Sequence, residues 1–491
     1  MAWREALAPV RMQRVALVAP RAALRDLLVR VADAGTVELD LVPAGGDGTS
    51  QAQRLHRRQQ RRAGESAVTP LLSPAPPDLE ALDRDDRLDL LAGEAEVEEH
   101  ADAAVVRGEL AALAGWTPTD QVGPLTERLA EVGGGVVPLA TPRGVDPPTL
   151  LRDGGELRRA FTPLVETYAT VPYADIDITL LAGVGYVFMF GMMFGDAGHG
   201  ALLLLAGLLI RFGGLRRLVR FRQVWPFAVG AGLAAIAFGV LYGEFFGPTS
   251  VLPVIWLDPL DQPVTLLATA LGVGAVLLAG AYVVGTVNRW REGGWALALC
   301  APSGIAGAAL FLGLGLVVLG WDVGTGWVTG IGVLVGLVGL ALAYVGLLAA
   351  AGGGGAGVTQ ATVELFDAVL RLGTNLVSFA RLAAFGLTHA ALGQVVWDGT
   401  TGLWGDGVAA SCGAVVLFLV GNAIAFALEA LVAGVQALRL EYYELFSRVF
   451  TTEGRAFRPW HVPLAPSPDD SAGVTPAAGT GPVLTTPERL P

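Results

Sequence analysis

Lysine is absent from this 491-residue sequence, so all 33 positions counted as Lys or Arg are arginines. A Walker A phosphate-binding loop needs its lysine to reach the nucleotide phosphates, and the sequence therefore excludes that kind of nucleotide site. The glycine run GGGGAGVT at 352–359 is interpreted instead as a connector between helices. We expect no catalytic residues, no cofactor and no metal ion in this chain.

Cysteine is scarce, and charged residues are few and mostly acidic. The two cysteines, Cys300 and Cys412, both lie in apolar segments, which excludes a disulfide framework and is typical of small core residues. The net charge of −12 argues against a nucleic-acid partner. Arginines interrupt residues 1–22 too often for the apolar core of a secretory signal, so we expect the amino terminus to stay in the cytosol.

Long apolar segments dominate from residue 178 to about residue 447. The sequence is 53% hydrophobic and only 16% charged, and several segments exceed the roughly 18 apolar residues that suggest a membrane span. The predicted fold class is therefore mainly α, a polytopic membrane protein. About eight transmembrane helices are expected, near 178–193, 197–212, 223–243, 263–287, 296–320, 326–350, 364–397 and 407–447.

Arginine placement predicts the orientation of these spans. Arginines cluster at 211–222 and 288–294, after the second and fourth spans, while the loops after the third, fifth and seventh spans carry almost none. Cytoplasmic loops are the ones enriched in arginine. We therefore expect a multi-pass protein of a bacterial or archaeal cell membrane, embedded in the lipid bilayer, with both termini cytoplasmic.

The first 175 residues hold most of the charge and predict a small cytosolic α/β domain. Strands are expected at 14–20 and 36–42 around a helix at 21–35, with a second β/α signal near 122–140. A basic run at 54–62 and an acidic run at 80–110 are interpreted as solvated helical arms. The expected domains are thus 1–175, the membrane domain 176–450, and a disordered cytosolic tail 451–491 rich in Pro, Gly, Thr and Ser.

The seventh span carries a polar stripe that includes a permanently charged residue, Arg381. Residues seven apart return to nearly the same face of a helix. Steps of seven from Arg381 reach Asp367, Thr374 and Thr388, and the intermediate steps of three and four add Arg371 and Ser378 to the same stripe. His389 follows Arg381 by eight positions and lies about 80° round the helix from it.

The eighth span carries a second stripe, formed by Asn422, Glu429, Gln436, Arg439 and Tyr443. A short loop joins the two spans, so they run antiparallel. Glu429 lies ten positions before Arg439, and His389 lies eight after Arg381. If the two arginines share a depth in the bilayer, Glu429 and His389 share another depth toward the outside.

A charge at the centre of a bilayer costs about 2.5–3.5 kcal/mol, so such residues are kept where they meet water or a counter-charge. Arginine does not release its proton near neutral pH, which makes Arg381 a fixed positive charge. Glu429 and His389 can exchange protons. One glutamate does not balance two arginines, so we expect a third party with its own buried acid.

These stripes resemble the membrane subunit of V-type and archaeal-type rotary ATPases, called subunit a or subunit I, of the V-ATPase 116 kDa subunit family. The resemblance covers nearly the whole chain except the tail. The matching segments are APVRMQRVALVAPRAALRDLLVRVADAGTVEL, VPYADIDIT, FMFGMMFGDAGHGALLLL, VLYGEFFG, VELFDAVLRLGTNLVSFARLAAFGLTHA and LEALVAGVQALRLEYYELF.

The resemblance implies a non-catalytic, ion-translocating stator subunit. Arg381 matches the arginine that separates two proton half-channels, and Arg439 matches the second arginine that supports it. Glu429 and His389 match positions of the outer half-channel. Asp367 matches an acidic position of the same network, although the stripe alone places it nearer the cytosol, so its half-channel stays open. Ser378 and Gln436 complete the expected translocation residues.

The resemblance also implies partners. These are a rotor ring of c-type proteolipids, peripheral-stalk subunits that bind the cytosolic domain, and the central-stalk and catalytic V1/A1-type subunits of the same complex. The region of about 175 residues before the first span is short for the family, which implies shortened helical arms. Glu441 stands where many members have His. The alternative is a stand-alone secondary transporter or channel in which Arg381 binds an anion.

Overall fold

The computed structural model describes residues 8–40, 51–56, 68–142, 144–152, 154–213, 222–405, 407–450 and 453–465. The chain divides into two compact units. The helical unit comprises Met1–Val10 and Thr149–Ala456, and the sheet unit comprises Arg11–Pro148 and Phe457–Pro491. Most of the expected basic loop at 211–222, most of the basic run at 54–62 and the part of the expected tail after residue 465 lie outside the described residues.

An antiparallel sheet forms the centre of the sheet unit, with the strand order β2–β4–β1–β5 and β3 paired to β4. The central strands β1 (Met12–Pro20) and β4 (Leu110–Pro118) pair along their whole length. Val15, Leu17 and Ala19 of β1 are buried, as expected where one face of a sheet is covered. The flanking strands are β2 (Glu38–Leu39), β3 (Val105–Arg107) and β5 (Gly135–Pro138).

Two successive segments of the sheet unit share one element order. β1 leads through η1 (Arg21–Ala23) and α2 (Leu24–Ala34) to β2, and β4 leads through η2 (Thr119–Gln121) and α6 (Val122–Ala130) to β5. A proline ends each central strand, because proline has no N–H to continue the ladder. The structure thus has the second β/α segment expected near 122–140.

The acidic run at 80–110 differs from the expected solvated arm. It forms α4 (Leu79–Arg84) and α5 (Leu88–Asp102), and α5 packs against α2. Leu91 and Val97 are buried in this contact, and Glu94 is buried in an ion pair with Arg25. The apolar residues of the run therefore outweigh its charge in deciding where the helix lies.

Residues 457–465 differ from the expected disordered tail, since they pack within the sheet unit. The backbone N–H of Trp460 donates to the carbonyl of Val37 at 2.8 Å. The Trp460 ring stacks on His100 with 3.9 Å between centroids, and Val462 is buried. Burial of these apolar side chains stabilises a segment whose composition alone suggests disorder.

Within the described residues, six helical segments are long and apolar enough to cross a membrane. This confirms the prediction of a mainly helical, polytopic membrane protein. α8 (Thr179–Met193) and α9 (Ala197–Phe212) are apolar but shorter, so the total of eight spans is not confirmed. The six segments are α10 (Trp225–Tyr242), α11 (Pro263–Cys300), α12 (Ile305–Asp322), α13 (Gly326–Ala350), α14 (Gly354–Ser378) with α15 (Ala380–Leu403), and α16 (Val408–Leu440) with its extension to Val449.

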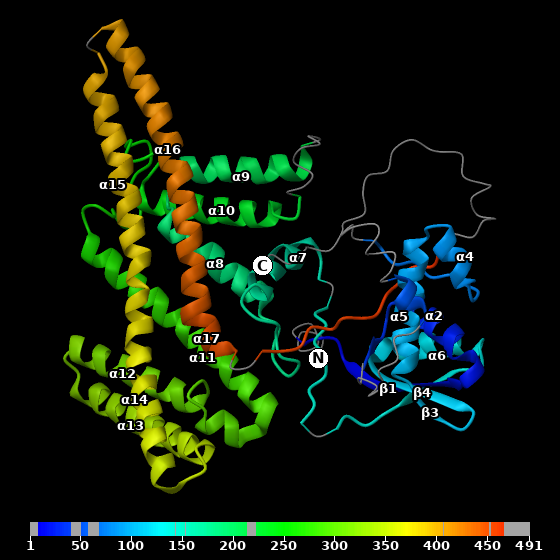
Figure 1. Ribbon diagram of the computed structural model, residues 1–491. Helices are drawn as coiled ribbons and strands as arrows, with labels where there is room; N and C mark the ends of the chain where they lie inside the picture. The colour runs from blue at the N-terminus through cyan, green and yellow to red at the C-terminus, as the bar shows by residue number, and fades with distance from the viewer. Residues whose placement is uncertain are drawn as a thin grey trace. The chain divides into compact units, whose positions relative to one another are not determined.

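Glycines bring α9 and α10 into close contact, and the two helices lie side by side in Figure 1. A Cβ at Gly239 would lie 2.1 Å from the backbone nitrogen of Ala197, and one at Gly232 would lie 2.6 Å from that of Leu204. Small residues permit this approach in membrane helices. The contact fixes the turn between α8 and α9, which carries Asp196.

A tight turn at Phe379 separates α14 from α15, where the sequence predicted one helix. The N–H of Leu382 donates to the Phe379 carbonyl three residues back, at 2.9 Å. The Phe379 ring is fully buried against Gly274 of α11, where a Cβ would lie 2.3 Å from the ring. The turn therefore resets the face on which α15 presents Arg381.

α16 lies beside α15 and continues into the π-helical turn η4 (Glu441–Phe446) and the short helix α17 (Ser447–Val449) (Figure 1). Glu441 and Glu444 of this turn are both buried. A π-helical turn shifts the following side chains round the helix, and such turns are frequent at functional sites.

Three stretches of backbone lie next to one another where the chain passes from one unit to the other. Val10 donates to the carbonyl of Leu150 at 2.8 Å, and Thr149 donates to that of Arg455 at 2.6 Å. Thr149 and Ala456 also form a parallel bridge. We call these three hydrogen-bonded stretches, 8–10, 149–152 and 455–456, the neck.

Candidate functional site

His389, on α15, is the centre of a buried polar group that we call the His389 cluster: Asp196, His199, Glu244, His389 and Glu429. Its Nδ1 hydrogen-bonds the carboxylate of Glu429 on α16. Its Nε2 lies 4.0 Å from Asp196 Oδ2 and 3.9 Å from Glu244 Oε2. The side chain of His389 is only 6% exposed, so these interactions take place away from solvent.

Asp196 is held by backbone hydrogen bonds from two segments. It caps the N-terminus of α9, where its Oδ1 accepts the His199 N–H at 2.8 Å. The N–H groups of Phe246 and Gly247, after α10, donate to the same carboxylate at 3.1 and 2.8 Å. These donors compensate a buried carboxylate and fix its direction.

His199 and Glu244 complete the cluster from the ends of α9 and α10. The His199 Nδ1 lies 3.8 Å from Asp196 Oδ1. Glu244 follows the left-handed residue Gly243 that ends α10, and the Ala197 N–H donates to the Glu244 carbonyl at 3.0 Å. The two helices that glycine packing holds together thus deliver three acidic or imidazole groups to α15.

Arg381 belongs to a second group, the Arg381 cluster, which consists of Ser378, Arg381 and Glu444. Its Nη2 lies 2.8 Å from Glu444 Oε1, and its Nε donates to the Ser378 carbonyl at 3.1 Å. Eight residues of helix separate Arg381 from His389, which corresponds to about 12 Å along the axis. Buried apolar side chains, among them Leu382 and Met192, lie in the core between these levels.

Glu441, the first residue of η4, is a buried acid that belongs to neither cluster. Its side chain lines a mostly apolar cavity of about 610 Å³ between η4, α8 and α11. Neither of its carboxylate oxygens makes a hydrogen bond within the part of the chain that the structure describes. Burial of a carboxyl group without a hydrogen-bond partner costs free energy, which distinguishes Glu441 from the acids of the two clusters.

The structure brings some of the predicted residues together and leaves others apart. His389 and Glu429 share one level, as the spacing predicted. Asp367 pairs with Arg371 at 2.7 Å on an exposed face of α14 and is not a member of either cluster. Gln436 is half-buried and Arg439 is exposed. The hydroxyl of Ser378 donates to the Thr374 carbonyl.

Sequence reasoning missed four residues of the two clusters. Asp196 and His199 lie in the GDAGHG segment and Glu244 in the YGEFFG segment, which were used only as marks of resemblance. A carboxylate and a histidine three apart in an apolar segment were a usable signal for the first pair. Glu444 was within the quoted eighth-span motif, and its role becomes visible only through the π-helical turn.

Comparison with known proteins gives one family and a set of relatives. Residues 103–247 match the V-type ATPase 116kDa subunit family. The chain is 29% identical to A-type ATP synthase subunit I of Pyrococcus horikoshii, over 72% of this chain and 54% of that protein. It is 28% identical to the subunit I of Halobacterium salinarum, over 64% of this chain and 52% of that protein.

A bacterial relative matches a shorter region. V-type ATP synthase subunit I 2 of Treponema pallidum is 31% identical over 32% of this chain and 35% of that protein. The chain spans about half the length of the archaeal relatives it matches. These matches confirm the resemblance on which the sequence-based prediction depended.

Proposed function

Because this chain is related to the V-type ATPase 116kDa subunit family and to A-type ATP synthase subunit I proteins, we propose that it is the stator membrane subunit of a rotary ATPase or ATP synthase. In this role it forms two proton half-channels against a rotor ring and couples proton flow to ATP hydrolysis or synthesis. The observation that carries the proposal is the pair of polar clusters at two levels of α15, one buried around His389 and one partly buried around Arg381.

The His389 cluster supplies the outer half-channel. Histidine and glutamate both exchange protons near neutral pH when their surroundings allow it. His389 contacts Glu429 through one ring nitrogen and faces Asp196 and Glu244 through the other. A proton that arrives at one side of the ring can therefore leave from the other side, toward Glu429 on α16.

The Arg381 cluster supplies the boundary between the half-channels. A guanidinium keeps its charge, and a carboxylate that approaches it is favoured in the ionised form. Glu444 binds Arg381 from within the chain, whereas we had expected an acid from a neighbouring polypeptide. The Arg381 side chain is still 25% exposed. A rotor carboxylate can therefore approach the open side of the guanidinium while Glu444 orients it.

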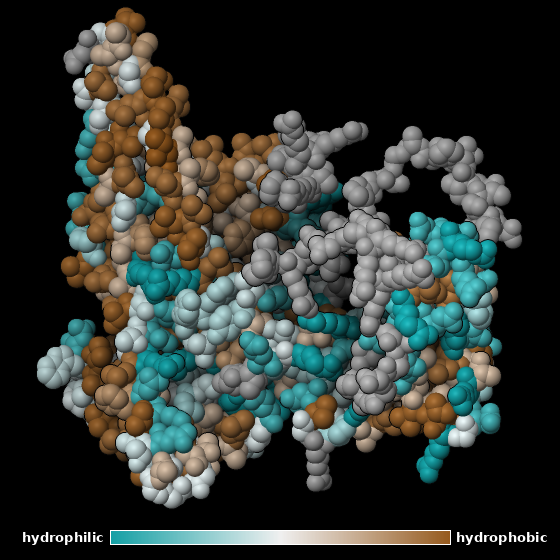
Figure 2. Space-filling model, viewed as in Figure 1, coloured by the Kyte–Doolittle hydropathy of each residue, from teal (hydrophilic) through white to brown (hydrophobic). Residues whose placement is uncertain are grey.

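The exposed surfaces of α14, α15 and α16 suit a partner in the membrane. Only 11% of the most apolar window of Val408–Val449 is buried within the chain, compared with 44% for α10. Figure 2 shows hydrophobic side chains along α15 and α16. Arg371, Arg439 and Asp367 are exposed beside this surface. Exposed charges among apolar residues favour a polypeptide with complementary polar groups over lipid alone.

The remaining partners and the orientation belong to the same proposal. Peripheral-stalk subunits bind the sheet unit, and the central-stalk and catalytic subunits complete the complex. The arginine-rich segments at 211–222 and 288–294 support cytoplasmic placement of both termini. Asp367 lies with Arg371, toward the cytoplasmic end of α14 in this orientation, which supports a place on the inner side.

The transporter alternative has weaker support. Arg381 already donates to Glu444 and to the Ser378 carbonyl, so the charge of the guanidinium is partly compensated before any anion arrives. An anionic substrate would meet the Glu444 charge as well as the arginine. The geometry therefore favours an arginine that is oriented for a transient carboxylate contact.

The test is Arg381→Ala in the assembled complex reconstituted into vesicles. We expect ATP-driven proton uptake to be abolished while the complex still assembles. Arg291→Ala, an exposed arginine of α11, serves as the matched control and should pump normally. Normal coupled pumping by Arg381→Ala would reject the stator proposal.

A further inference from the structure

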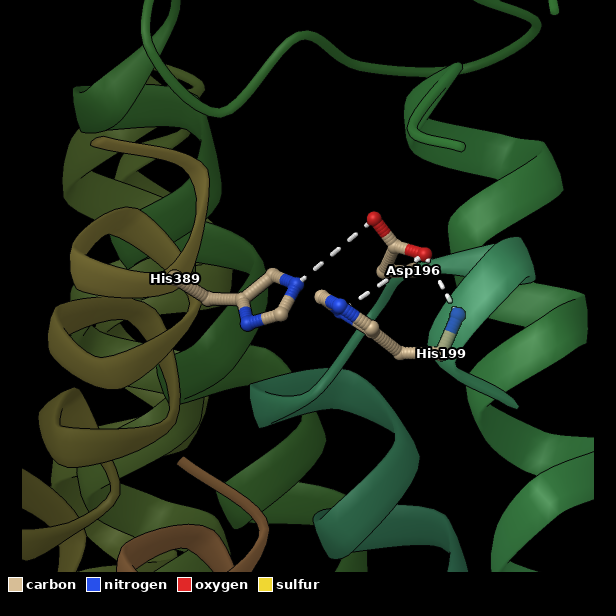
Figure 3. A group of neighbouring side chains, drawn as sticks. All are labelled: Asp196, His199 and His389. Atoms are coloured by element: carbon tan, nitrogen blue, oxygen red, sulfur yellow. Dashed lines mark hydrogen bonds and ion pairs between the residues drawn. The ribbon is translucent and has the colours of Figure 1, made fainter. Parts of the chain in front are cut away.

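Asp196, His199 and His389 form a donor group that proton transfer alone does not require. One potential ligand atom from each residue lies within 4.8 Å of the other two, and all three residues are buried. Figure 3 shows both imidazole rings directed toward the Asp196 carboxylate, His199 from α9 and His389 from α15. The three residues come from two segments that are at least 190 positions apart in the chain.

His199 is the member whose state is unexplained. Its side chain is 3% exposed, Asn422 is a neighbouring hydrogen-bonding group, and neither ring nitrogen makes a hydrogen bond of regular length and angle within the described residues. Buried polar side-chain atoms are hydrogen-bonded in the large majority of cases, and each exception asks for an explanation such as an ion. The ring is held in position by the aromatic rings of Phe194, Phe246 and Phe426 around it.

His389 has the arrangement of a histidine prepared to ligate a metal. Ligating histidines commonly place their second ring nitrogen against a carboxylate, which fixes the tautomer and raises the basicity of the ligand atom. Here Glu429 binds Nδ1, and Nε2 faces Asp196 and Glu244. Asp196 is likewise fixed by three backbone N–H groups.

The donor set selects a class of metal. Two imidazoles and one or two carboxylates suit a divalent transition-metal ion, whereas calcium and magnesium prefer oxygen ligands. Zinc bonds of about 2.1 Å place tetrahedral donors roughly 3.4 Å apart. The three potential ligand atoms lie within 4.8 Å of one another, so the side chains must move closer by up to about 1.4 Å to reach that spacing.

We propose that Asp196, His199 and His389 bind a divalent transition-metal ion such as zinc, with Glu244 as a fourth ligand, and that the bound ion blocks proton movement through the His389 cluster. The blocking effect depends on the proposed function, but the binding does not. A metal on Nε2 of His389 occupies the ring nitrogen that faces Asp196 and Glu244, through which a proton would enter the ring on its way to Glu429.

The binding test uses the purified chain in lipid nanodiscs, with zinc chloride as the probe. Equilibrium dialysis should find one tightly bound zinc per chain, and X-ray absorption should show a first shell with two imidazoles. His199→Ala and the amide variant His199→Gln should each weaken binding at least tenfold. His100→Ala, a buried histidine of the sheet unit, is the matched control and should keep the site.

Two results would overturn the site: no stoichiometric zinc on the unaltered chain, or equal binding by both folded His199 variants. The blocking effect is tested separately, in vesicles that contain the whole complex. Zinc should reduce proton uptake by the unaltered complex and by His100→Ala in parallel with its occupancy. Full occupancy with unchanged uptake would overturn the block. Zinc binding to a complex that never moves protons would count against the proposed function alone.

Discussion

The Nη2 atom of Arg381 lies 2.8 Å from the Oε1 atom of Glu444, a residue 63 positions later in the same chain. The glutamate side chain is 5% exposed and the arginine 25%. The pair thus buries the acid and leaves one side of the guanidinium open. An arginine held in this way has a defined direction before any partner arrives, which lowers the ordering cost of a transient contact.

Replacement of Glu444 by glutamine should weaken this orientation. Glu444→Gln keeps the size of the side chain but removes the charge that holds Arg381. We expect slower coupled proton uptake and a loss of roughly 1–3 kcal/mol of stability, typical of a charged hydrogen bond with a buried partner. Proton uptake in vesicles and thermal unfolding of the purified complex measure the two effects.

Glu364→Gln provides the control for this change. Glu364 is an exposed residue of α14 that accepts a hydrogen bond from Gln360, so its loss should alter neither measurement. Equal behaviour of the two variants would show that Glu444 does not orient the arginine.

Glu429→Gln should slow proton flux while the complex still assembles. The glutamine can keep a hydrogen bond to His389 but cannot take up a proton near neutral pH. The proton path therefore loses one group that accepts and releases protons. We expect uptake to fall about tenfold or more. Asp398→Asn, which changes an exposed acidic residue of α15, is the control. Unchanged uptake by Glu429→Gln would remove this residue from the path.

Asp175, just before α8, should make stability depend on pH. Burial, followed by a hydrogen bond with Glu292 and by the charge of that residue, raises the pKa of Asp175 to about 8. A raised pKa means that the folded chain favours the neutral acid. Its contribution is therefore complete below the unfolded value near 4, declines as the pH rises, and is lost once the pH passes 8.

The variant Asp175→Asn isolates this effect, because the amide stays neutral at every pH. Thermal unfolding of both proteins between pH 5 and pH 9 should show the unaltered chain losing stability relative to Asp175→Asn as the pH rises. A constant difference across this range would mean that the carboxyl group does not titrate as the structure indicates.

Gly239→Ala should separate α9 from α10. Its added methyl would lie 2.1 Å from the Ala197 nitrogen, so the helices must move, at a cost of about 1–3 kcal/mol. Thermal unfolding should detect the loss, and proton uptake should fall because the Asp196 turn shifts. Gly330→Ala on α13, where a Cβ meets open space, should leave both unchanged.

Sequence reasoning located the level of His389 and Glu429 because both lie on regular helices, where residue spacing converts directly into depth. The same reasoning linked Asp367 to Arg381 by assuming one straight helix. The turn at Phe379 divides that helix, because a buried ring fits against Gly274 of the distant helix α11. No local pattern in α14 or α15 reveals such a contact.

Glu444 and Asp196 show two other limits of sequence reasoning. The π-helical turn changes the angle at which Glu444 leaves its helix, and heptad spacing does not anticipate this change. Asp196 reaches His389 only because glycine contacts fix α9 against α10. Residues 457–465 illustrate the reverse case, in which a tail rich in Pro, Gly, Thr and Ser begins with Trp460, Val462 and Leu464, which pack in the core of the sheet unit.

The neck has a mechanical consequence. The chain crosses between its two units after residues 10, 148 and 456, and the three crossings are cross-linked by backbone hydrogen bonds. Three separate links therefore connect the two units, where most two-unit chains have one. A single proteolytic cut at any one crossing would also leave the two units tethered by the other two.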